Sequence, residues 1–235
     1  HSLSTALIVD GPDAARKAAR YNIKYGADQI KLMATGGVLS MGDEPGAQEM
    51  TLEEMQAAIQ IAQMHGKLTS AHAHGAAGIK AAVRAGITSI EHGMLMDDEC
   101  VELMAIHGTY LIPTIIAAHQ IATEGASLGL SPAFVDKAKR CLENHARNLE
   151  KCRAARVRIG FGTDAGTACN PHGKQALEVS LMQRAGFTPI EALHAATRVN
   201  AQLFGMAEDL GTVETGKLAD IIAVDKSPLE DIQAL

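Results

Sequence analysis

Residues 52–74, LEEMQAAIQIAQMHGKLTSAHAH, contain one complete unit of a pattern that recurs along the chain. Residues 52–65 have apolar side chains at helical spacing. At their start, Thr51 and Glu54 form the sequence of a capping box. Gly66 follows, where a glycine suits the left-handed backbone that often ends a helix. A short apolar strand then ends in two histidines. The unit therefore predicts a helix, a tight turn and a strand with a polar end.

The same order of helix, glycine and strand recurs on both sides of this unit. Helices are predicted over 14–25, 76–85 and 98–107, and strands over 29–33, 87–91 and 109–114. A longer unit has a helix predicted over 132–155 before a strand over 157–163. Two further helices are predicted over 173–185 and 189–197, the second starting at the capping sequence TPIE of residues 188–191.

Helices that alternate with short strands indicate right-handed βαβ units and a parallel sheet. Glycine, threonine and serine lie beside the apolar residues of these strands, which favours the tight interior of a barrel over a flat, doubly wound sheet. We expect an α/β fold, a (β/α)8 TIM-like barrel of which the chain covers roughly strands four to eight. Residues 1–207 would form this part, and residues 208–235 would supply strands of a small β-sandwich element.

Composition narrows the class of protein. The 235 residues are 47% apolar and carry a formal charge of −6 without a basic cluster, so nucleic acid is not an expected partner. No apolar run approaches the roughly 20 residues of a membrane-spanning helix, and no membrane is expected. The four cysteines form no CxxC pair, which favours free thiols and a cytoplasmic location.

Four polar residues lie where predicted strands end: His72, His74, His92 and Asp164. The carboxyl ends of parallel strands meet at one face of a barrel, so these side chains should gather there. Residues two apart in a strand share a face, which puts His72 and His74 on the same side. Neutral imidazoles with a carboxylate suit a borderline divalent metal ion, and zinc is the usual one.

Lys31 lies inside the apolar strand 29–33, where a buried ammonium group would be costly. One interpretation is that the side chain extends to the barrel mouth or pairs with an acid. Another is that its desolvated, neutral amine reacts with CO₂ to form a carbamate, an anionic ligand with two oxygens that can bridge two metal ions.

These motifs resemble those of the amidohydrolase superfamily and, within it, the branch of prolidase-like and carboxypeptidase-like zinc-dependent metallopeptidases. The resemblance extends almost from end to end. The motifs that carry it are GADQIK at 26–31 with ATGG at 34–37, AHAHG at 71–75, EHG at 91–93, GTDAG at 162–166, and the ending from LGTV at 210–213 through GKLAD at 216–220.

The resemblance implies a role for each matching residue. Lys31 would be the carboxylated, bridging lysine, and His72 and His92 would bind the second metal ion. Asp164 would bind the first metal ion and act as the catalytic base toward the bridging water. His74 occupies a position that contacts the substrate in relatives, many of which have tyrosine there. The implied cofactors are two Zn²⁺ ions per complete site and the CO₂-derived carbamate on Lys31.

Other histidines are weaker candidates. His119 and His172 follow the last two predicted strands and could contact substrate. We expect a structural or solvent-exposed position for His65, His107, His145 and His194.

One motif of the superfamily has no counterpart here. Its members have an H-x-H at the end of the first strand, but the only H-x-H in this chain spans 72–74, after a candidate lysine ligand. The chain is therefore expected to be the carboxyl-terminal part of a longer protein, because half a barrel would expose unpaired strand edges.

The expected function is metal-dependent hydrolysis of an amide or peptide bond next to a free carboxylate. The partner would be a small amide or peptide substrate, and a homo-oligomer is possible. Two alternatives stay open: a hydrolase of the same superfamily that acts on a cyclic amide or an imidazolone, and a non-catalytic fragment or scaffold.

Overall fold

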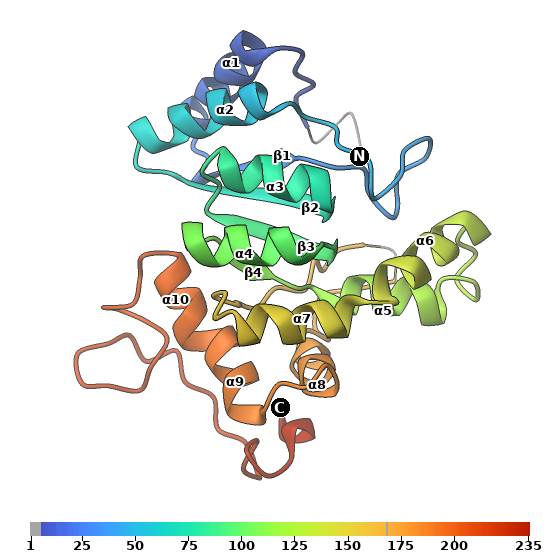
Figure 1. The fold of residues 1–235 in the computed structure, drawn as a ribbon. Helices are drawn as coiled ribbons and strands as arrows, with labels where there is room; N and C mark the ends of the chain where they lie inside the picture. The colour runs from blue at the N-terminus through green and yellow to red at the C-terminus, as the bar shows by residue number, and fades with distance from the viewer. Residues whose placement is uncertain (1–5, 168) are drawn as a thin grey trace.

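The computed structural model describes residues 6–167 and 169–235, and its centre is a parallel sheet (Figure 1). The sheet contains β1 (Gln29–Met33), β2 (Leu68–Gly75), β3 (Ser89–Leu95) and β4 (Tyr110–Ile112), which lie side by side in chain order. Each neighbouring pair is parallel. Every strand is therefore joined to the next by a helical crossover, as the repeated pattern predicts.

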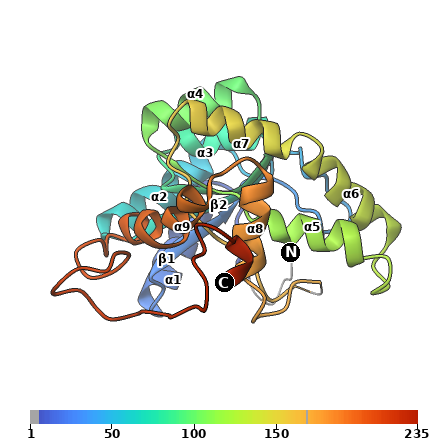
Figure 2. The ribbon, with the colours of Figure 1, turned by 90° about the horizontal axis from the view of Figure 1, so that it is seen from below.

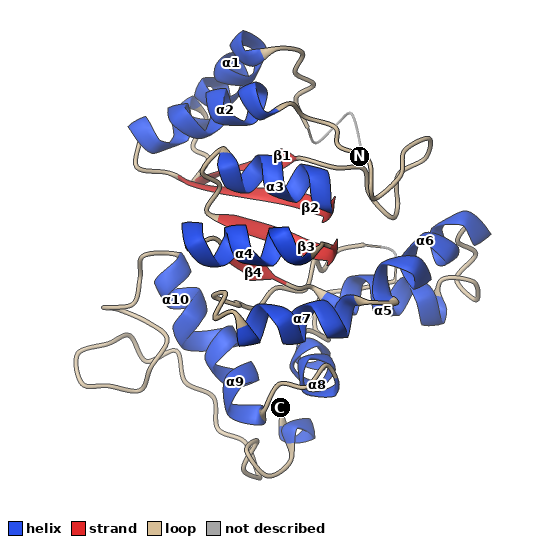
Figure 3. Cartoon of the chain, viewed as in Figure 1, coloured by secondary structure: helices blue, strands red, loops and turns tan. Residues whose placement is uncertain are grey.

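In the described part of the chain, α-helices α1 to α10 surround this sheet or extend from it (Figure 3). Helices α3, α4 and α7 cover one face, since α3 packs on β2 and β3, and α7 packs on β3 and α4 (Figure 2). The helices are α1 Pro12–Lys24, α2 Leu52–Met64, α3 Ala76–Arg84, α4 Asp98–His107, α5 Ile115–Glu124, α6 Pro132–Leu142, α7 His145–Ala154, α8 Ala176–Arg184, α9 Pro189–His194 and α10 Asn200–Leu203, with the π-helical turn η1 Ala195–Val199 before α10 and the 3₁₀ turn η2 Ile232–Ala234 near the end.

The glycines and capping boxes recognised in the sequence form the helix ends and helix starts that they predict. Gly66 and Gly108 follow α2 and α4 with φ angles of 63° and 65°, in the left-handed region that glycine adopts at little cost. Thr51 and Thr188 each form a capping box with the glutamate three residues later. The predicted parallel α/β arrangement is confirmed in these elements.

The segment predicted as a fifth strand, residues 157–163, forms only one bridge to β4, from Leu111 to Ile159. Leu111 N–H donates to Arg158 O at 2.9 Å, and Gly160 N–H donates to Leu111 O at 2.9 Å. Pairing stops there because β4 is short: Pro113 has no N–H to donate and ends the strand. The segment nevertheless lies beside β4, where a fifth strand would.

One predicted helix needs correction, and one observed helix was not predicted. The single helix predicted over 132–155 is divided into α6 and α7, because Asn144 leaves helical geometry with φ −113° and ψ 5°. The apolar residues after Thr114 form α5, which the sequence analysis did not assign as a helix.

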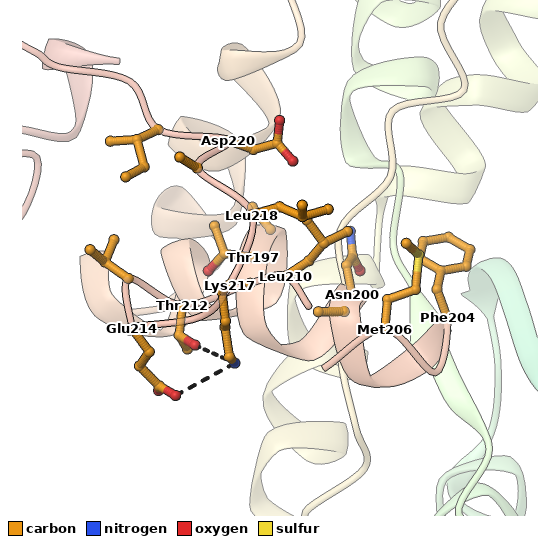
Figure 4. Close-up of a pocket in the computed structure, with 16 residues that line it drawn as sticks. Thr197, Asn200, Phe204, Met206, Leu210, Thr212, Glu214, Lys217, Leu218 and Asp220 are labelled. Carbon is orange, nitrogen blue, oxygen red and sulfur yellow. Dashed lines mark hydrogen bonds and ion pairs between the residues drawn. The ribbon is translucent and has the colours of Figure 1, made fainter. Parts of the chain in front are cut away.

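The strands predicted within residues 210–225 do not form in the described structure, which shows turns and irregular backbone there. Val213 and Ile222 are 83% and 77% exposed, and no described strand pairs with them. A strand needs such a partner for its backbone N–H and C=O groups. Lys217 organises this segment, because its Nζ donates to Thr212 Oγ1 at 2.6 Å and lies 3.7 Å from a Glu214 carboxylate oxygen (Figure 4). Among the described helices, none has the length and apolar character needed to cross a bilayer.

The carboxylate of Glu54 should contribute measurably to folding, because it joins the starts of two helices. It accepts hydrogen bonds from Thr51 N at 2.8 Å and from Gly11 N at 2.8 Å. We expect Glu54→Ala to lower the free energy of unfolding by about 1–2 kcal/mol in urea denaturation at neutral pH. Glu53→Ala is the matched control, since Glu53 is an exposed acid in the same helical turn. Equal losses in the two variants would contradict the assignment.

Candidate metal centre

Three imidazoles meet at the carboxyl ends of β2 and β3. The ring centroids of His72 and His74 are 4.8 Å apart, those of His72 and His92 are 4.7 Å apart, and those of His74 and His92 are 4.8 Å apart. Each ring offers a nitrogen within 4.8 Å of the nitrogens of the others, and all three residues are buried. The cluster has the ligand type and number that a zinc ion takes from protein.

Strand geometry produces this cluster. His72 and His74 alternate along β2 with Ala71 and Ala73, which are fully buried in the hydrophobic core. Ala73 pairs with His92 across the parallel register, so the middle of β3 reaches the level of the two β2 histidines. The predicted common face of His72 and His74 is confirmed by their edge-to-face contact.

Backbone and hydroxyl groups fix the tautomers of two rings. His72 Nε2 lies 3.0 Å from Gly36 O, and because a carbonyl only accepts, Nε2 carries the proton and Nδ1 has the lone pair. His92 Nδ1 lies 2.6 Å from Thr114 Oγ1. The Thr114 hydroxyl donates to Pro113 O at 2.9 Å, so His92 Nδ1–H donates to the hydroxyl oxygen and Nε2 has the lone pair. Such contacts orient imidazoles as metal ligands.

Burial keeps these rings neutral. It lowers the pKa of His72 to about 4, against an opposing effect of the hydrogen bond to Gly36, and it holds the pKa values of His74 and His92 well below their ordinary range. A neutral imidazole has the lone pair that metal binding requires.

His145 on α7 is a fourth buried histidine near the cluster, and a charge on it would lower the pKa of His74 and of His92. Burial lowers the pKa of His145 itself to about 4, and the nearby Pro113 carbonyl opposes this shift. The sequence predicts a structural or solvent-exposed position for His145, and the structure places it among the buried residues.

The backbone is strained at three positions around the site. His92, Thr114 and Asp164 have φ angles of 76°, 44° and 52°, and the only other described non-glycine residue with positive φ is Arg156. A non-glycine residue in this region costs about 1–3 kcal/mol, and such strain concentrates at functional sites.

Lys31 and Asp164 line the same cavity of about 470 Å³ as the three histidines. The structure therefore brings together all five residues predicted from the strand ends and from the lysine-containing strand. Lys31 is exposed, however, because it lies on the open face of the edge strand β1, so of the two interpretations of this lysine the described chain shows the extended side chain and not the desolvated amine. Desolvation by the surrounding protein raises the pKa of Asp164, and the nearby Lys31 opposes the shift.

The two other predicted substrate contacts, His119 and His172, are not among the residues that line this cavity. His119 lies on α5, and His172 is exposed in the loop before α8. Their role in substrate binding stays a prediction. The cavity is instead completed by residues that are mostly apolar, namely Met33, Gly37, Val38, Leu39, Ser40, Met94, Ala117, Ala118, Ile121 and Thr167.

The loop that supplies the cavity residues 37–40 is held by a buried lysine. Lys137 on α6 donates from Nζ to Ser40 O at 3.0 Å and to Asp43 O at 2.5 Å, and it is only 7% exposed. The sequence analysis missed this wall of the cavity, because Lys137 has the helical spacing of an ordinary surface residue.

Glu178 on α8 is a second group that the sequence analysis missed. It is fully buried, and its carboxylate accepts hydrogen bonds from Ile115 N and Ile116 N, at the start of α5. Burial raises its pKa to about 8, and the two hydrogen bonds oppose this shift. The only signal in the sequence is an acid within the apolar helical stretch ALEVSLM of residues 176–182.

Comparison with known proteins places this geometry in context. Residues 2–235 match the model of the amidohydrolase family. An ochratoxinase from Aspergillus niger is 37% identical over 230 residues, which are 96% of this chain and 46% of the relative.

Two solved structures are also similar. A Xaa-Pro dipeptidase with methionine bound in its active site has 37% identity and a TM-score of 0.88, over 96% of this chain and 55% of that one. A prolidase complexed with N-methylphosphonate-L-proline has 34% identity and a TM-score of 0.90, over 97% of this chain and 55% of that one. The chain thus spans about half the length of these relatives, and its fold matches about half of each of the two solved chains.

The buried His145 should make folding sensitive to acid. Its pKa is about 4 in the folded chain and 6.5 ordinarily, so below pH 6.5 the unfolded chain binds a proton that the folded chain does not. Stability is therefore lost as the pH falls from 6.5 toward 4. His145→Leu should reduce the loss between pH 7 and pH 5 by about 2 kcal/mol in urea denaturation. His107→Leu, at an exposed helix end, should leave that loss unchanged. A full acid dependence in His145→Leu would contradict this origin.

Proposed function

Because this chain belongs to the amidohydrolase family, we propose that it serves in the metal-dependent hydrolysis of an amide or peptide bond next to a free carboxylate. The family resemblance seen in the sequence motifs is confirmed by the match over residues 2–235. The observation that carries the proposal is the meeting of Lys31, three buried imidazoles and Asp164 in one cavity.

The donor set fits a divalent metal ion. Among the described residues, His72 and His92 each offer a buried ring nitrogen, and these two nitrogens lie within 4.8 Å of each other. Imidazoles kept neutral by burial, together with a carboxylate, suit zinc. Lys31, His72, His92 and Asp164 would hold the metal ions. Zinc, when bound in such a site, polarises a carbonyl group and lowers the pKa of water.

Lys31 would contribute as a carbamate. Its neutral amine nitrogen forms a bond to the carbon of CO₂ and releases a proton to solvent, which leaves an anionic group with two oxygens. The position of Lys31 supports this role, because it lines the same cavity as the three histidines and a carbamate on it would face their rings.

Asp164 would move the proton. It would accept a proton from the attacking water and donate it to the leaving amine nitrogen. Its raised pKa supports this assignment, because a carboxylate with a higher pKa is a stronger base than an ordinary aspartate. The left-handed backbone at Asp164, where φ is 52°, turns the chain at the end of the segment beside β4.

The cavity also supports a substrate with a small apolar side chain. Met33, Val38, Met94 and Ile121 line it beside the histidines. Two relatives hold methionine or a phosphonate derivative of proline, and both amino acids have a carboxylate. His74 is the residue that we propose to contact this carboxylate, since its ring lines the cavity.

Removal of the Lys31 amine should abolish metal-dependent activity. We expect Lys31→Ala to lose bound metal and the hydrolysis of dipeptides and N-acyl amino acids, with partial rescue by acetate or propionate, whose carboxylates can replace the carbamate. The measurements are metal content and turnover at rising carboxylate concentration. Lys67→Ala is the control, because Lys67 is a strand-end lysine whose ion pair with Asp28 lies outside the cavity. Full activity of Lys31→Ala would refute the bridging role.

Asp164→Asn should keep the fold and lose turnover. Asparagine preserves the size of the side chain but cannot accept the proton, so kcat should fall by at least the roughly 10²-fold typical of a lost general base. Far-ultraviolet circular dichroism would show whether the fold persists. A variant with normal kcat would exclude Asp164 as the proton carrier, and a wild-type chain that takes up zinc without any hydrolysis would contradict the proposed function as a whole.

A further inference from the structure

A continuous line of contacts joins the buried carboxylate of Glu178 to the ring of His92. Glu178 accepts hydrogen bonds from Ile115 N at 2.8 Å and from Ile116 N at 2.6 Å. The residue directly before these amides is Thr114, whose Oγ1 lies 2.6 Å from His92 Nδ1. All of these groups are buried, and α8, which carries Glu178, packs against α5 (Figure 2).

We propose that Glu178 and Thr114 are positioning residues that set the orientation and the tautomer of His92. Their effect on metal affinity rests on the proposed function, which makes His92 a ligand. Their effect on the tautomer of the metal-free His92 ring is independent of the proposed function.

The hydroxyl of Thr114 determines which nitrogen of His92 carries the proton. A hydroxyl group has one hydrogen, and that of Thr114 is directed to Pro113 O at 2.9 Å. The remaining contact, at 2.6 Å, must then be a hydrogen bond from His92 Nδ1–H to the hydroxyl oxygen. This places the lone pair of His92 on Nε2.

Thr114 needs support from its surroundings to hold this position. Its φ and ψ angles of 44° and 46° lie in the left-handed region, which is unfavourable for a β-branched residue. Its hydroxyl does not cap α5, because no side-chain cap is formed at this helix start. Without another acceptor, the first amides of α5 would be buried and unsatisfied.

Glu178 supplies that acceptor from a distant part of the chain. Each of its two carboxyl oxygens accepts a hydrogen bond from one of the first two amides of α5. The side chain is fully buried, and loss of its oxygens would leave the two amides buried and unsatisfied. The turn at Thr114 is thereby fixed between β4 and a helix start that cannot move without losing both bonds.

The alternative is that Glu178 and Thr114 only stabilise the fold. The two roles differ in what a substitution changes. A purely structural cap would lower the stability of the chain and leave the His92 tautomer and the metal affinity as they are. If the two residues position His92, a substitution changes the tautomer of the His92 ring and its affinity for metal.

The test uses three substitutions in the whole chain. Thr114→Val removes the hydroxyl but keeps the branched shape, Thr114→Ser restores the hydroxyl, and Glu178→Gln leaves one amide of α5 without a carboxylate acceptor. Thr188→Val is the matched control, since it removes a threonine helix cap at the start of α9 outside the cavity. Thermal unfolding of each metal-free variant would show that it is folded.

Two measurements on folded protein decide the outcome. Long-range ¹H–¹⁵N NMR of the metal-free chain should show His92 as the Nδ1–H tautomer in the wild type and in Thr114→Ser, and as a mixture in Thr114→Val. Titration with Zn²⁺ should show a loss of about 10–100-fold in affinity for Thr114→Val and a smaller loss for Glu178→Gln. Thr188→Val should lose stability only.

An Nε2–H tautomer in the wild type, or wild-type tautomer and affinity in Thr114→Val and Glu178→Gln, would overturn the positioning role. These outcomes are separate from the fate of the proposed function. A chain that hydrolyses no amide but shows the expected change of tautomer would contradict only the proposed function. A chain that hydrolyses amides but keeps its zinc affinity in Thr114→Val would contradict only the positioning role.

Discussion

The parallel pairing of β2 with β3 is the constraint on which the rest of the site depends. It sets Ala73 opposite His92, so three imidazoles from two strands reach one place. The same register puts Ala71 and Ala73 into the hydrophobic core. A slip of one residue would exchange the two faces of β2 and bury the histidines among apolar residues. Core packing and ligand geometry are therefore fixed by the same hydrogen bonds.

The sequence was sufficient where the cause of a structure is local. Helix starts and ends follow from capping boxes and glycines, and the common face of His72 and His74 follows from strand periodicity. It was insufficient where the cause is distant. Glu178 acts on amides 62 and 63 residues away, and nothing near it in the sequence shows that it is buried. The predicted strands of the tail depend on pairing partners, and none pairs with them in the described residues.

The exposure of Lys31 also depends on residues that are distant in the sequence. Its strand was predicted correctly, but the exposure of its side chain depends on what lies beside the edge of the sheet. The neighbours of a strand are not encoded in its own residues, so periodicity predicts two faces without saying which one is covered. The apolar face of β1, with Ile30 and Leu32, packs into the core, and the polar face that carries Lys31 stays open.

The site is thus built from two parts that differ in how they are held. The imidazoles are buried, and two of them are oriented by contacts within the described chain, through Gly36 O and Thr114 Oγ1. Lys31 and Asp164 lie at the exposed side of the same cavity. Desolvation penalises charge on the buried rings, and it also raises the pKa of the Asp164 carboxyl group. Imidazoles that are neutral before the metal ion arrives suit the metal site that we propose, in which Lys31 would carry the carbamate and Asp164 would transfer the proton.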